Sequence, residues 1–213
     1  MNLDSARKYR EIVAHYEACF HRYGDTHLGV DWPNARDAET RYRVMLDVVR
    51  PDGAAGASLL DFGCGTSHLY EYMLRYGLER RLMYSGLDLS TAFVKASQDK
   101  FPDVRYYCAD LLAEDKEIPE FDYVVMNGVF TEKRELTQEE MIAYFRLLIA
   151  KIFPRVRIGL AFNVMSKLVD WEREDLFHLP FDTLAAILTK EASKHFVIRH
   201  DYHLYEYTVY VYR

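Results

Sequence analysis

Two carboxylates and two glycines have the spacing with the clearest chemical meaning in this chain. The apolar run Ser58–Phe62 contains Asp61 and leads into Gly63 and Gly65, after which a helical pattern begins. Glycines at a strand-to-helix turn allow bare backbone amides and a helix N-terminus to approach a ligand closely. A second apolar run is followed by Asp88, at roughly the 20-residue distance of a ribose-binding carboxylate in dinucleotide folds. This spacing predicts a site for a nucleoside-like ligand.

A regular alternation of short apolar runs and helical patterns would position these residues. The predicted strands are Ser58–Phe62, Leu82–Leu87, Val104–Cys108, Tyr123–Met126 and Arg157–Phe162. Helices are predicted at Thr66–Tyr76, at Ser90–Lys100 with Ser90 as the cap, and after a capping box formed by Thr137 and Glu140. Short apolar strands that alternate with helices indicate an α/β fold with a doubly wound parallel sheet covered on both faces.

The two ends of the chain depart from this alternation. Helical spacing in the first 23 residues and again around Tyr42 predicts an N-terminal helical cap over residues 1–50, ahead of a core at 57–213. After a helix around Leu184, the runs His195–Tyr202 and Tyr205–Tyr212 lie too close together for a crossover helix and must form an antiparallel hairpin. No linker or repeat interrupts the pattern, so residues 1–213 are interpreted as a single domain.

Four motifs in order resemble the Rossmann-like (class I) S-adenosylmethionine-dependent methyltransferases. The family's glycine-rich stretch begins with an acid, matched by Asp61, and its ribose-binding acid corresponds to Asp88. Its adenine-contacting acid after the third strand corresponds to Asp110. The segment Phe121–Phe130 looks like the family's fourth strand, whose end faces the transferred methyl group. The resemblance covers about residues 57–130 by motif and the remainder by element order.

The resemblance implies a seven-stranded, mostly parallel sheet with a C-terminal antiparallel hairpin, and S-adenosylmethionine as the cofactor. Ser67 stands where the family often has a third glycine, which leaves the loop less permissive without excluding the cofactor. The cofactor contacts that the resemblance implies are made by Asp61, Phe62, Gly63, Cys64, Gly65, Asp88, Leu89, Asp110, Leu111 and Asn127.

Methyl transfer from a sulfonium depends mainly on alignment, so it needs little acid–base machinery. A hydroxyl acceptor would be helped by a base, for which His27, His68 and His200 are candidates, whereas an amine needs only to arrive neutral. Asn127, at the end of the fourth strand, is assigned to the catalytic residues together with His27 and His68, through a contact with substrate or cofactor. A turn-forming Asn-Gly pair explains it nearly as well.

Aromatic faces are candidates to hold the sulfonium or the acceptor, because the ring quadrupole attracts a cation. Trp32 and Phe130 are expected to contact the substrate, with Tyr9 and Tyr16 as further candidates. The tyrosines of the last strand are interpreted as sheet packing. The acidic run Asp170–Asp175 is interpreted as a solvated helix face.

Composition limits the classes of partner. The 27 Lys and Arg residues against 33 Asp and Glu give a net charge of −6, which disfavours nucleic acid and favours a small metabolite such as a sugar or a natural-product intermediate. Three scattered cysteines form neither a disulfide framework nor a CxxC metal site. The first ten residues lack the apolar run of a signal peptide or anchor, so a cytoplasmic protein without membrane contact is expected.

Two other functions remain open at this level. A nicotinamide-dependent oxidoreductase would want a third glycine at position 68, where the chain has His68, and has no role for Asp61. A non-catalytic subunit would bind S-adenosylmethionine without turning it over. The aromatic-rich final strand could also pair across a homodimer.

Overall fold

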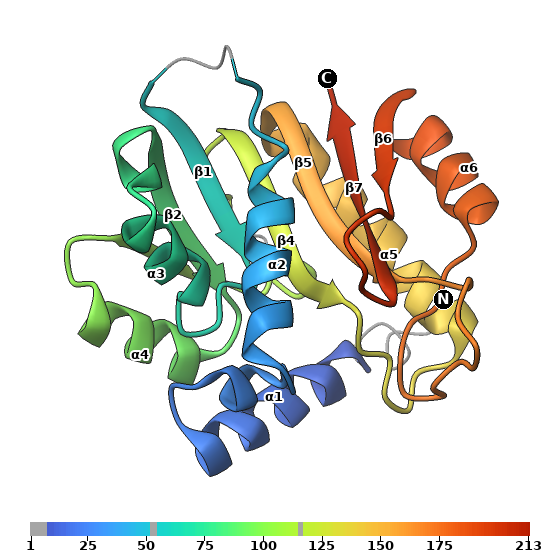
Figure 1. The fold of residues 1–213 in the computed structure, drawn as a ribbon, viewed down its shortest axis with the longest axis horizontal. Helices are drawn as coiled ribbons and strands as arrows, with labels where there is room; N and C mark the ends of the chain where they lie inside the picture. Colours follow the sequence, from blue (N-terminus) through green and yellow to red (C-terminus); the bar gives the residue numbers. More distant parts are fainter. Residues whose placement is uncertain (1–7, 52–54, 115–116) are drawn as a thin grey trace.

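The computed structural model describes residues 8–51, 55–114 and 117–213, which form one seven-stranded sheet with helices on both faces (Figure 1). The order across the sheet is β3-β2-β1-β4-β5-β7-β6. The strands are β1 Ala57–Phe62, β2 Leu82–Asp88, β3 Arg105–Cys108, β4 Phe121–Phe130, β5 Val156–Met165, β6 His195–Arg199 and β7 Glu206–Tyr212. The first five pair in parallel, and β7 runs antiparallel to both neighbours. The predicted mostly parallel sheet with its C-terminal hairpin is confirmed.

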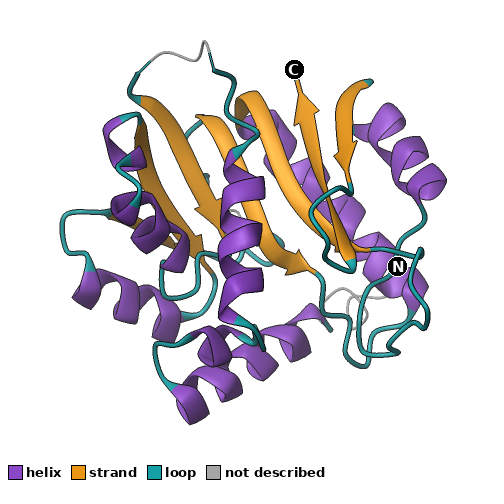
Figure 2. Cartoon of the chain, viewed as in Figure 1, coloured by secondary structure: helices purple, strands orange, loops and turns teal. Residues whose placement is uncertain are grey.

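Helices form the two outer layers (Figure 2). On one face lie α2 Ala35–Leu46 and α3 His68–Arg75, and on the other α5 Gln138–Ile152 and α6 Phe181–Glu191. The remaining helical segments are α1 Tyr9–Tyr23, η2 His27–Val30, η3 Leu78–Arg80, α4 Thr91–Lys100 and η4 Phe153–Arg155. Alternate residues of β4 supply both layers: Tyr123 and Val125 join the α2/α3 cluster, while Val124 and Met126 join the α5/α6 cluster.

The segment predicted as a cap over residues 1–50 divides into two parts. Helix α1 and the short helix η2 lie across the carboxyl ends of the parallel strands, as expected of a cap (Figure 1). Helix α2 instead packs on the sheet, because its buried stripe, which includes Tyr42 and Met45, is wide enough to face the strands. Residues 1–7 of the predicted first helix lie outside the described part of the chain.

The predicted N-terminal caps of two helices are confirmed, whereas the helix predicted at Asp170–Asp175 is wrong. The Thr137–Glu140 capping box opens α5, and the Ser90 side chain accepts from the Phe93 amide at the start of α4. The run Asp170–Asp175 is a loop and not a helix face. There, Arg173 pairs with Asp175 two residues on, a spacing that a helix would place on different faces.

The position of β7 contradicts the prediction that the final strand pairs with its copy in a homodimer. This strand lies between β5 and β6 and pairs with both, so neither of its edges is free to join a second copy. Of the tyrosines predicted to pack in the last strand, Tyr207 and Tyr210 are buried and Tyr212 is half-buried, as predicted. The prediction is wrong for Tyr205, which precedes β7 and is 68% exposed. None of the described helices has the length and apolarity needed to cross a membrane.

Candidate active site

The glycine-rich loop between β1 and α3 has the backbone form that its sequence predicted. Gly63 and Gly65 have φ angles of +75° and +52°, which L side chains rarely adopt. The Gly63 and Cys64 amides donate to the Leu87 carbonyl at 2.7 and 3.0 Å, which ties the loop to β2. A Cβ on Gly63 would lie 2.8 Å from Val129 Cγ2. Only glycine therefore allows the loop to pass this close to the end of β4.

Ser67, the departure from the family pattern, is accommodated by its own hydrogen bonds. Its φ is +62°, and its side chain is fully buried. The Ser67 hydroxyl donates to Ser97 Oγ at 2.9 Å and shares a second bond of 2.9 Å with the Tyr106 hydroxyl. These bonds fix the left-handed conformation that a glycine would adopt freely.

Asp88 ends β2 next to the glycine loop. Its carboxylate accepts from the Gly65 amide at 3.0 Å and from the Ser90 amide at 2.9 Å. Burial raises the pKa of Asp88 to about 6, against the lowering effect of these amides. One carboxylate thus fixes the loop and presents its remaining lone pairs to the cavity beside it.

Asp61, at the end of β1, is only 3% exposed and accepts from the Tyr84 hydroxyl at 2.8 Å. Burial is the main cause that raises the pKa of Asp61 to about 7, and the charge of Asp88 adds to it. Two carboxylates with raised pKa values, and with no cationic partner in residues 8–51, 55–114 and 117–213, suit a ligand that brings positive charge.

Asp110, after β3, already has partners from the cap. It accepts from the Tyr9 hydroxyl at 2.8 Å and from Arg10 at 3.1 Å, and the Leu112 amide donates to it at 3.2 Å. The Tyr9 ring stacks on Tyr144 of α5 with centroids 5.2 Å apart. The N-terminal end of α1 is therefore fastened to the predicted adenine-contacting acid.

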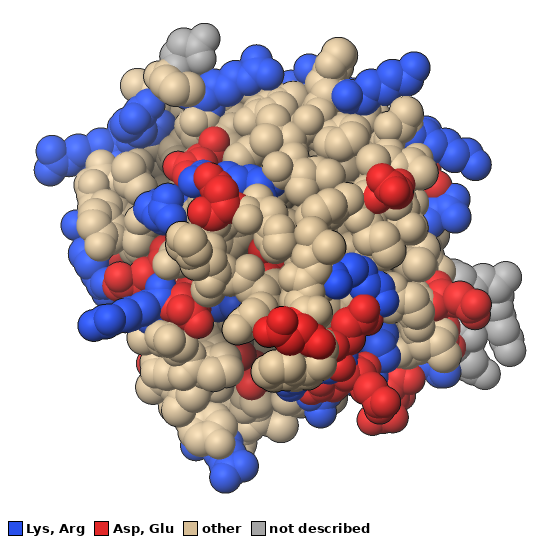
Figure 3. Space-filling view, turned by 45° about the vertical axis from the view of Figure 1, so that its right-hand side comes forward, with Lys and Arg blue, Asp and Glu red and all other residues tan. Residues whose placement is uncertain are grey.

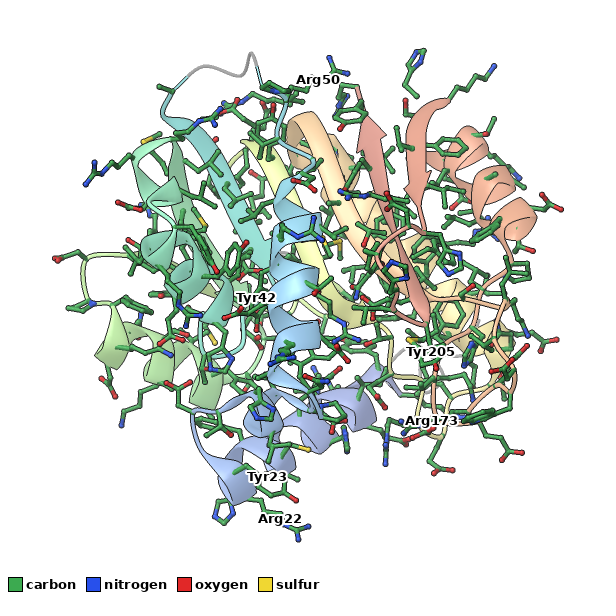
Figure 4. All side chains as sticks on the ribbon, in the orientation of Figure 1. Arg22, Tyr23, Tyr42, Arg50, Arg173 and Tyr205 are labelled. Atoms are coloured by element: carbon green, nitrogen blue, oxygen red, sulfur yellow. The ribbon has the colours of Figure 1, made fainter. Side chains whose placement is uncertain are left out.

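These groups surround one cavity with about 1080 Å³ of empty space, counting the part open to solvent. It lies between the sheet edge and α1, where parallel α/β sheets bind ligands. All ten predicted cofactor residues line it, with His68, Trp32, Tyr9 and Tyr16. Tyr42 and Tyr144, which the sequence analysis did not assign to the site, also line the cavity, and Figure 4 marks Tyr42 on α2.

Two predicted site residues lie elsewhere. Phe130, expected to contact substrate, is fully buried among Phe145 and Phe162 and does not line the cavity. The β4–β5 register shifts between Met126 and Phe130, and beyond this irregularity Phe130 pairs with Val164 and its side chain lies in the core. His27 does not line the cavity either, and its Nδ1 lies 2.6 Å from the Trp32 carbonyl. It fixes the loop that carries Trp32.

The two other predicted catalytic residues reach the cavity. His68 Nε2 lies 2.8 Å from Asp25 Oδ1 and 3.1 Å from Thr66 Oγ1, and burial lowers the pKa of its imidazole. Asn127 has a buried Oδ1 that has no hydrogen-bond partner among the residues that the structure describes. Because a buried carbonyl oxygen is costly to leave unpaired, a ligand donor is expected to meet it.

A polar network that the sequence did not reveal supports the strand end beside Asn127. Asn163 of β5 accepts from the Gly128 amide at 2.8 Å and donates to Glu206 of β7 at 2.9 Å. Arg41 of α2 donates to the other oxygen of Glu206 at 2.8 Å, and its guanidinium lies 4.1 Å from the Trp32 ring centroid. These residues are far apart in sequence, so no spacing signal could have linked them.

Fold and site together define the class of protein: a Rossmann-like methyltransferase architecture whose glycine loop and strand-end acids fit an adenosyl cofactor. A family model described as "Methyltransferase domain" matches residues 60–150. Rv1506c of Mycobacterium tuberculosis, a protein assigned as a methyltransferase, is 28% identical over 156 residues, which cover 72% of this chain and 92% of that protein.

Solved structures share the fold. Magnesium protoporphyrin IX methyltransferase from Synechocystis PCC 6803, with bound S-adenosylmethionine, has a TM-score of 0.66 at 16% identity and covers 100% of this chain and 98% of its own. The plantazolicin methyltransferase BpumL, with a substrate analogue and S-adenosylhomocysteine, has a TM-score of 0.60 at 11% identity, with coverage of 98% and 99%. Residues 60–150 thus match the methyltransferase family, and the whole chain shares its fold with methyltransferases solved with S-adenosylmethionine or S-adenosylhomocysteine, so these findings favour a methyltransferase over the oxidoreductase alternative.

Proposed function

We propose that this chain is a class I S-adenosylmethionine-dependent methyltransferase that acts on the oxygen or nitrogen of a small-molecule acceptor bound beside Asn127. The observation that carries the proposal is the Asn127 Oδ1, unpartnered within the described part of the chain, in a cavity walled by Tyr16, Trp32 and Tyr42. One orienting acceptor among aromatic side chains is typical of a small-molecule site. A sugar or a natural-product intermediate fits this description.

The charge distribution supports a small acceptor over a nucleic acid. The net charge is −6. On the face in Figure 3, many Lys and Arg side chains follow the upper rim, while the lower half carries a group of Asp and Glu with some Lys and Arg among them. A polyanion would meet carboxylates on that side of the molecule.

S-adenosylmethionine supplies, when bound, an electrophilic methyl group on a sulfonium. Asp88 would accept from the ribose hydroxyls, and the Gly63–Gly65 backbone would allow close approach. Asp61 places negative charge at the carboxyl end of β1, and Tyr16 and Trp32 present aromatic side chains to the same cavity. One face of Trp32 carries Arg41, so the indole acts mainly as a fixed wall.

The chain's own contribution to transfer is alignment and exclusion of water. Helix α1 covers the cavity from outside, with Ile12 and Val13 on its wall. His68 is the base candidate that lines the cavity, and its lowered pKa keeps the imidazole neutral near pH 7. A hydroxyl acceptor would give its proton to His68 directly or through water, whereas an amine acceptor would not need it.

Turnover with a panel of hydroxyl and amine metabolites, read as S-adenosylhomocysteine formation, tests the proposal. Asn127→Ala is expected to raise KM for the acceptor, with the cofactor Kd changed less. His68→Gln is expected to lower kcat for hydroxyl acceptors only. Methylation of RNA or protein by the wild type, with no small acceptor turned over, would contradict the proposal. Cytoplasmic location and a homodimer stay predictions from the sequence.

A further inference from the structure

Three metal-ligating side chains converge behind the aromatic wall of the cavity. Among the residues that the structure describes, His15, Cys19 and Asp31 form the one group of three His, Cys, Asp or Glu residues whose donor atoms all lie within 4.8 Å of one another. His15 Nε2 lies 2.7 Å from Asp31 Oδ2 and 3.8 Å from Cys19 Sγ. All three residues are half-buried.

The backbone brings these side chains together from two elements. His15 and Cys19 lie four residues apart on α1, so they share one face of that helix. Asp31 follows η2 in a left-handed conformation, with its amide donating to the Leu28 carbonyl at 3.1 Å. Its neighbours Val30 and Trp32 both line the cavity, whereas Asp31 faces α1.

The arrangement differs from a nucleophilic Cys-His-Asp triad. In a triad the imidazole uses one nitrogen toward the nucleophile and the other toward the carboxylate. Here the same atom, His15 Nε2, faces both Cys19 and Asp31. Three donor atoms that converge from separate side chains are instead the pattern of a coordination site.

We propose that His15, Cys19 and Asp31 bind a zinc ion that fastens α1 to the η2 loop. Sulfur, imidazole nitrogen and carboxylate oxygen are zinc ligands, and three protein ligands leave a fourth position for water. Tetrahedral bonds of about 2.0–2.1 Å to nitrogen and about 2.3 Å to sulfur separate those two atoms by about 3.5 Å. The observed separation of 3.8 Å therefore needs little movement, and the Asp31 carboxylate, 2.7 Å from His15 Nε2, would withdraw by about 0.6–0.8 Å.

The charges balance around such an ion. Zinc binding releases the thiol proton of Cys19, so a thiolate, a carboxylate and a neutral imidazole compensate the two positive charges. Glu132, only 7% exposed, lies close enough to Asp31 for the two carboxylates to repel. Arg134, 3.5 Å from Glu132, offsets part of that repulsion, and an ion at Asp31 would offset more.

The zinc ion would take no part in methyl transfer. It would affect the cofactor cavity by holding α1 and the η2 loop, which form part of the cavity wall, in place. Tyr16 adjoins His15, and its hydroxyl donates to the Gly128 carbonyl at 3.3 Å. Val30 and Trp32 flank Asp31 on the η2 side. An ion that joins the two elements would therefore hold this wall in place. It is distinct from the methyl-transfer site, so its test does not depend on the proposed acceptor.

Titration of the tag-free, metal-stripped protein with Co²⁺ tests the proposal. The wild type is expected to bind one Co²⁺ with tetrahedral visible bands and a thiolate-to-cobalt charge-transfer band, and Zn²⁺ should displace it. Cys19→Ser should lose the charge-transfer band. Outer-shell changes already cost about 10- to 100-fold in metal affinity, so His15→Gln and Asp31→Asn should weaken binding at least that much.

Cys108→Ser is the matched control, because Cys108 lies at the end of β3 and outside the group. It should keep the full spectrum. A thermal scan provides the second measurement: Zn²⁺ should raise the Tm of the wild type and of Cys108→Ser, but not of Cys19→Ser. A wild type without a saturable Co²⁺ complex at millimolar concentration, or a Cys19→Ser variant that keeps the band, would overturn the proposal. Circular dichroism shows whether Cys19→Ser is folded. If it is not, the loss of Co²⁺ affinity in a folded His15→Gln variant tests the proposal instead.

Discussion

At the scale of single residues, the cavity holds two acids that are expensive to ionise. Asp61 and Asp88 have pKa values raised from 3.8 to about 7 and about 6, chiefly by burial. Because the folded state favours their protonated forms, these two groups contribute a loss of stability to the unliganded protein as the pH rises from about 4 to about 7. The affinity for a cationic cofactor depends on pH in the opposite direction, because the ionised carboxylates are the forms that attract the cation.

We therefore expect affinity for S-adenosylmethionine to increase as the pH rises through 6 and 7 and to level off above, following the raised pKa values of Asp88 and Asp61. Asp61→Asn should remove the part of this increase in affinity that occurs near pH 7. Calorimetric titration from acid to alkaline pH measures it, with Asp99→Asn on the exposed face of α4 as the control. An affinity that does not change with pH would show that neither carboxylate meets the cofactor's charge.

Asp88→Ala gives the sharpest single-residue prediction. Charge-assisted hydrogen bonds contribute about 1.5–3 kcal/mol each, so the loss of two to the ribose should weaken cofactor binding by at least about a hundredfold. The variant also frees the Gly65 amide, so its Tm must be measured beside its Kd. Retained micromolar affinity in a folded variant would remove Asp88 from the site.

At the scale of elements, a buried ion pair joins α2 to β7. The side chains of Arg41 and Glu206 are only 12% and 1% exposed, and Asn163 connects the pair to the end of β4. The network ties three sequence-distant elements to the backbone beside Asn127.

Arg41→Met should leave Glu206 buried without a countercharge and cost about 3–5 kcal/mol in the free energy of unfolding. The double variant Arg41→Met with Glu206→Gln should recover part of that loss, because no unpaired charge remains. Urea unfolding of the two single variants and the double variant gives the coupling energy. Additive single effects would mean that the two side chains do not depend on each other.

At the scale of the whole molecule, α1 is a cap with few buried contacts. Tyr9 and Ile12 are its fully buried residues, and its two ends are held by polar contacts. Tyr9 and Arg10 hold one end at Asp110, while Asp25, just past the other end, binds Lys100 at 2.6 Å and His68. Figure 4 shows Arg22 and Tyr23 projecting from this second end, away from the sheet.

We expect amide hydrogen exchange to be faster in α1 than in β4 and β5, because segments with few apolar contacts open locally at low cost. S-adenosylhomocysteine should slow exchange in α1, since its residues line the cavity that the ligand fills. Mass spectrometry of peptides from α1, with peptides from β6 at the far edge as the control, measures this. Equal protection with and without ligand would mean that α1 does not close on the cofactor.

The amino-acid sequence by itself determined the sheet, its hairpin and the cofactor loop, because those features depend on short-range patterns. Apolar runs, the Thr137 capping box and the spacing of Asp61, Gly63 and Gly65 act within a few residues of one another. Only the tertiary structure decided which residues face the cavity. Phe130 lies in the core beyond an irregularity in the β4–β5 register, while Tyr42 and Tyr144 meet the cavity, because the packing of distant elements sets the direction of a side chain. The Arg41–Glu206 pair and the His15–Cys19–Asp31 group arise in the same way, from contacts between segments that no local pattern connects.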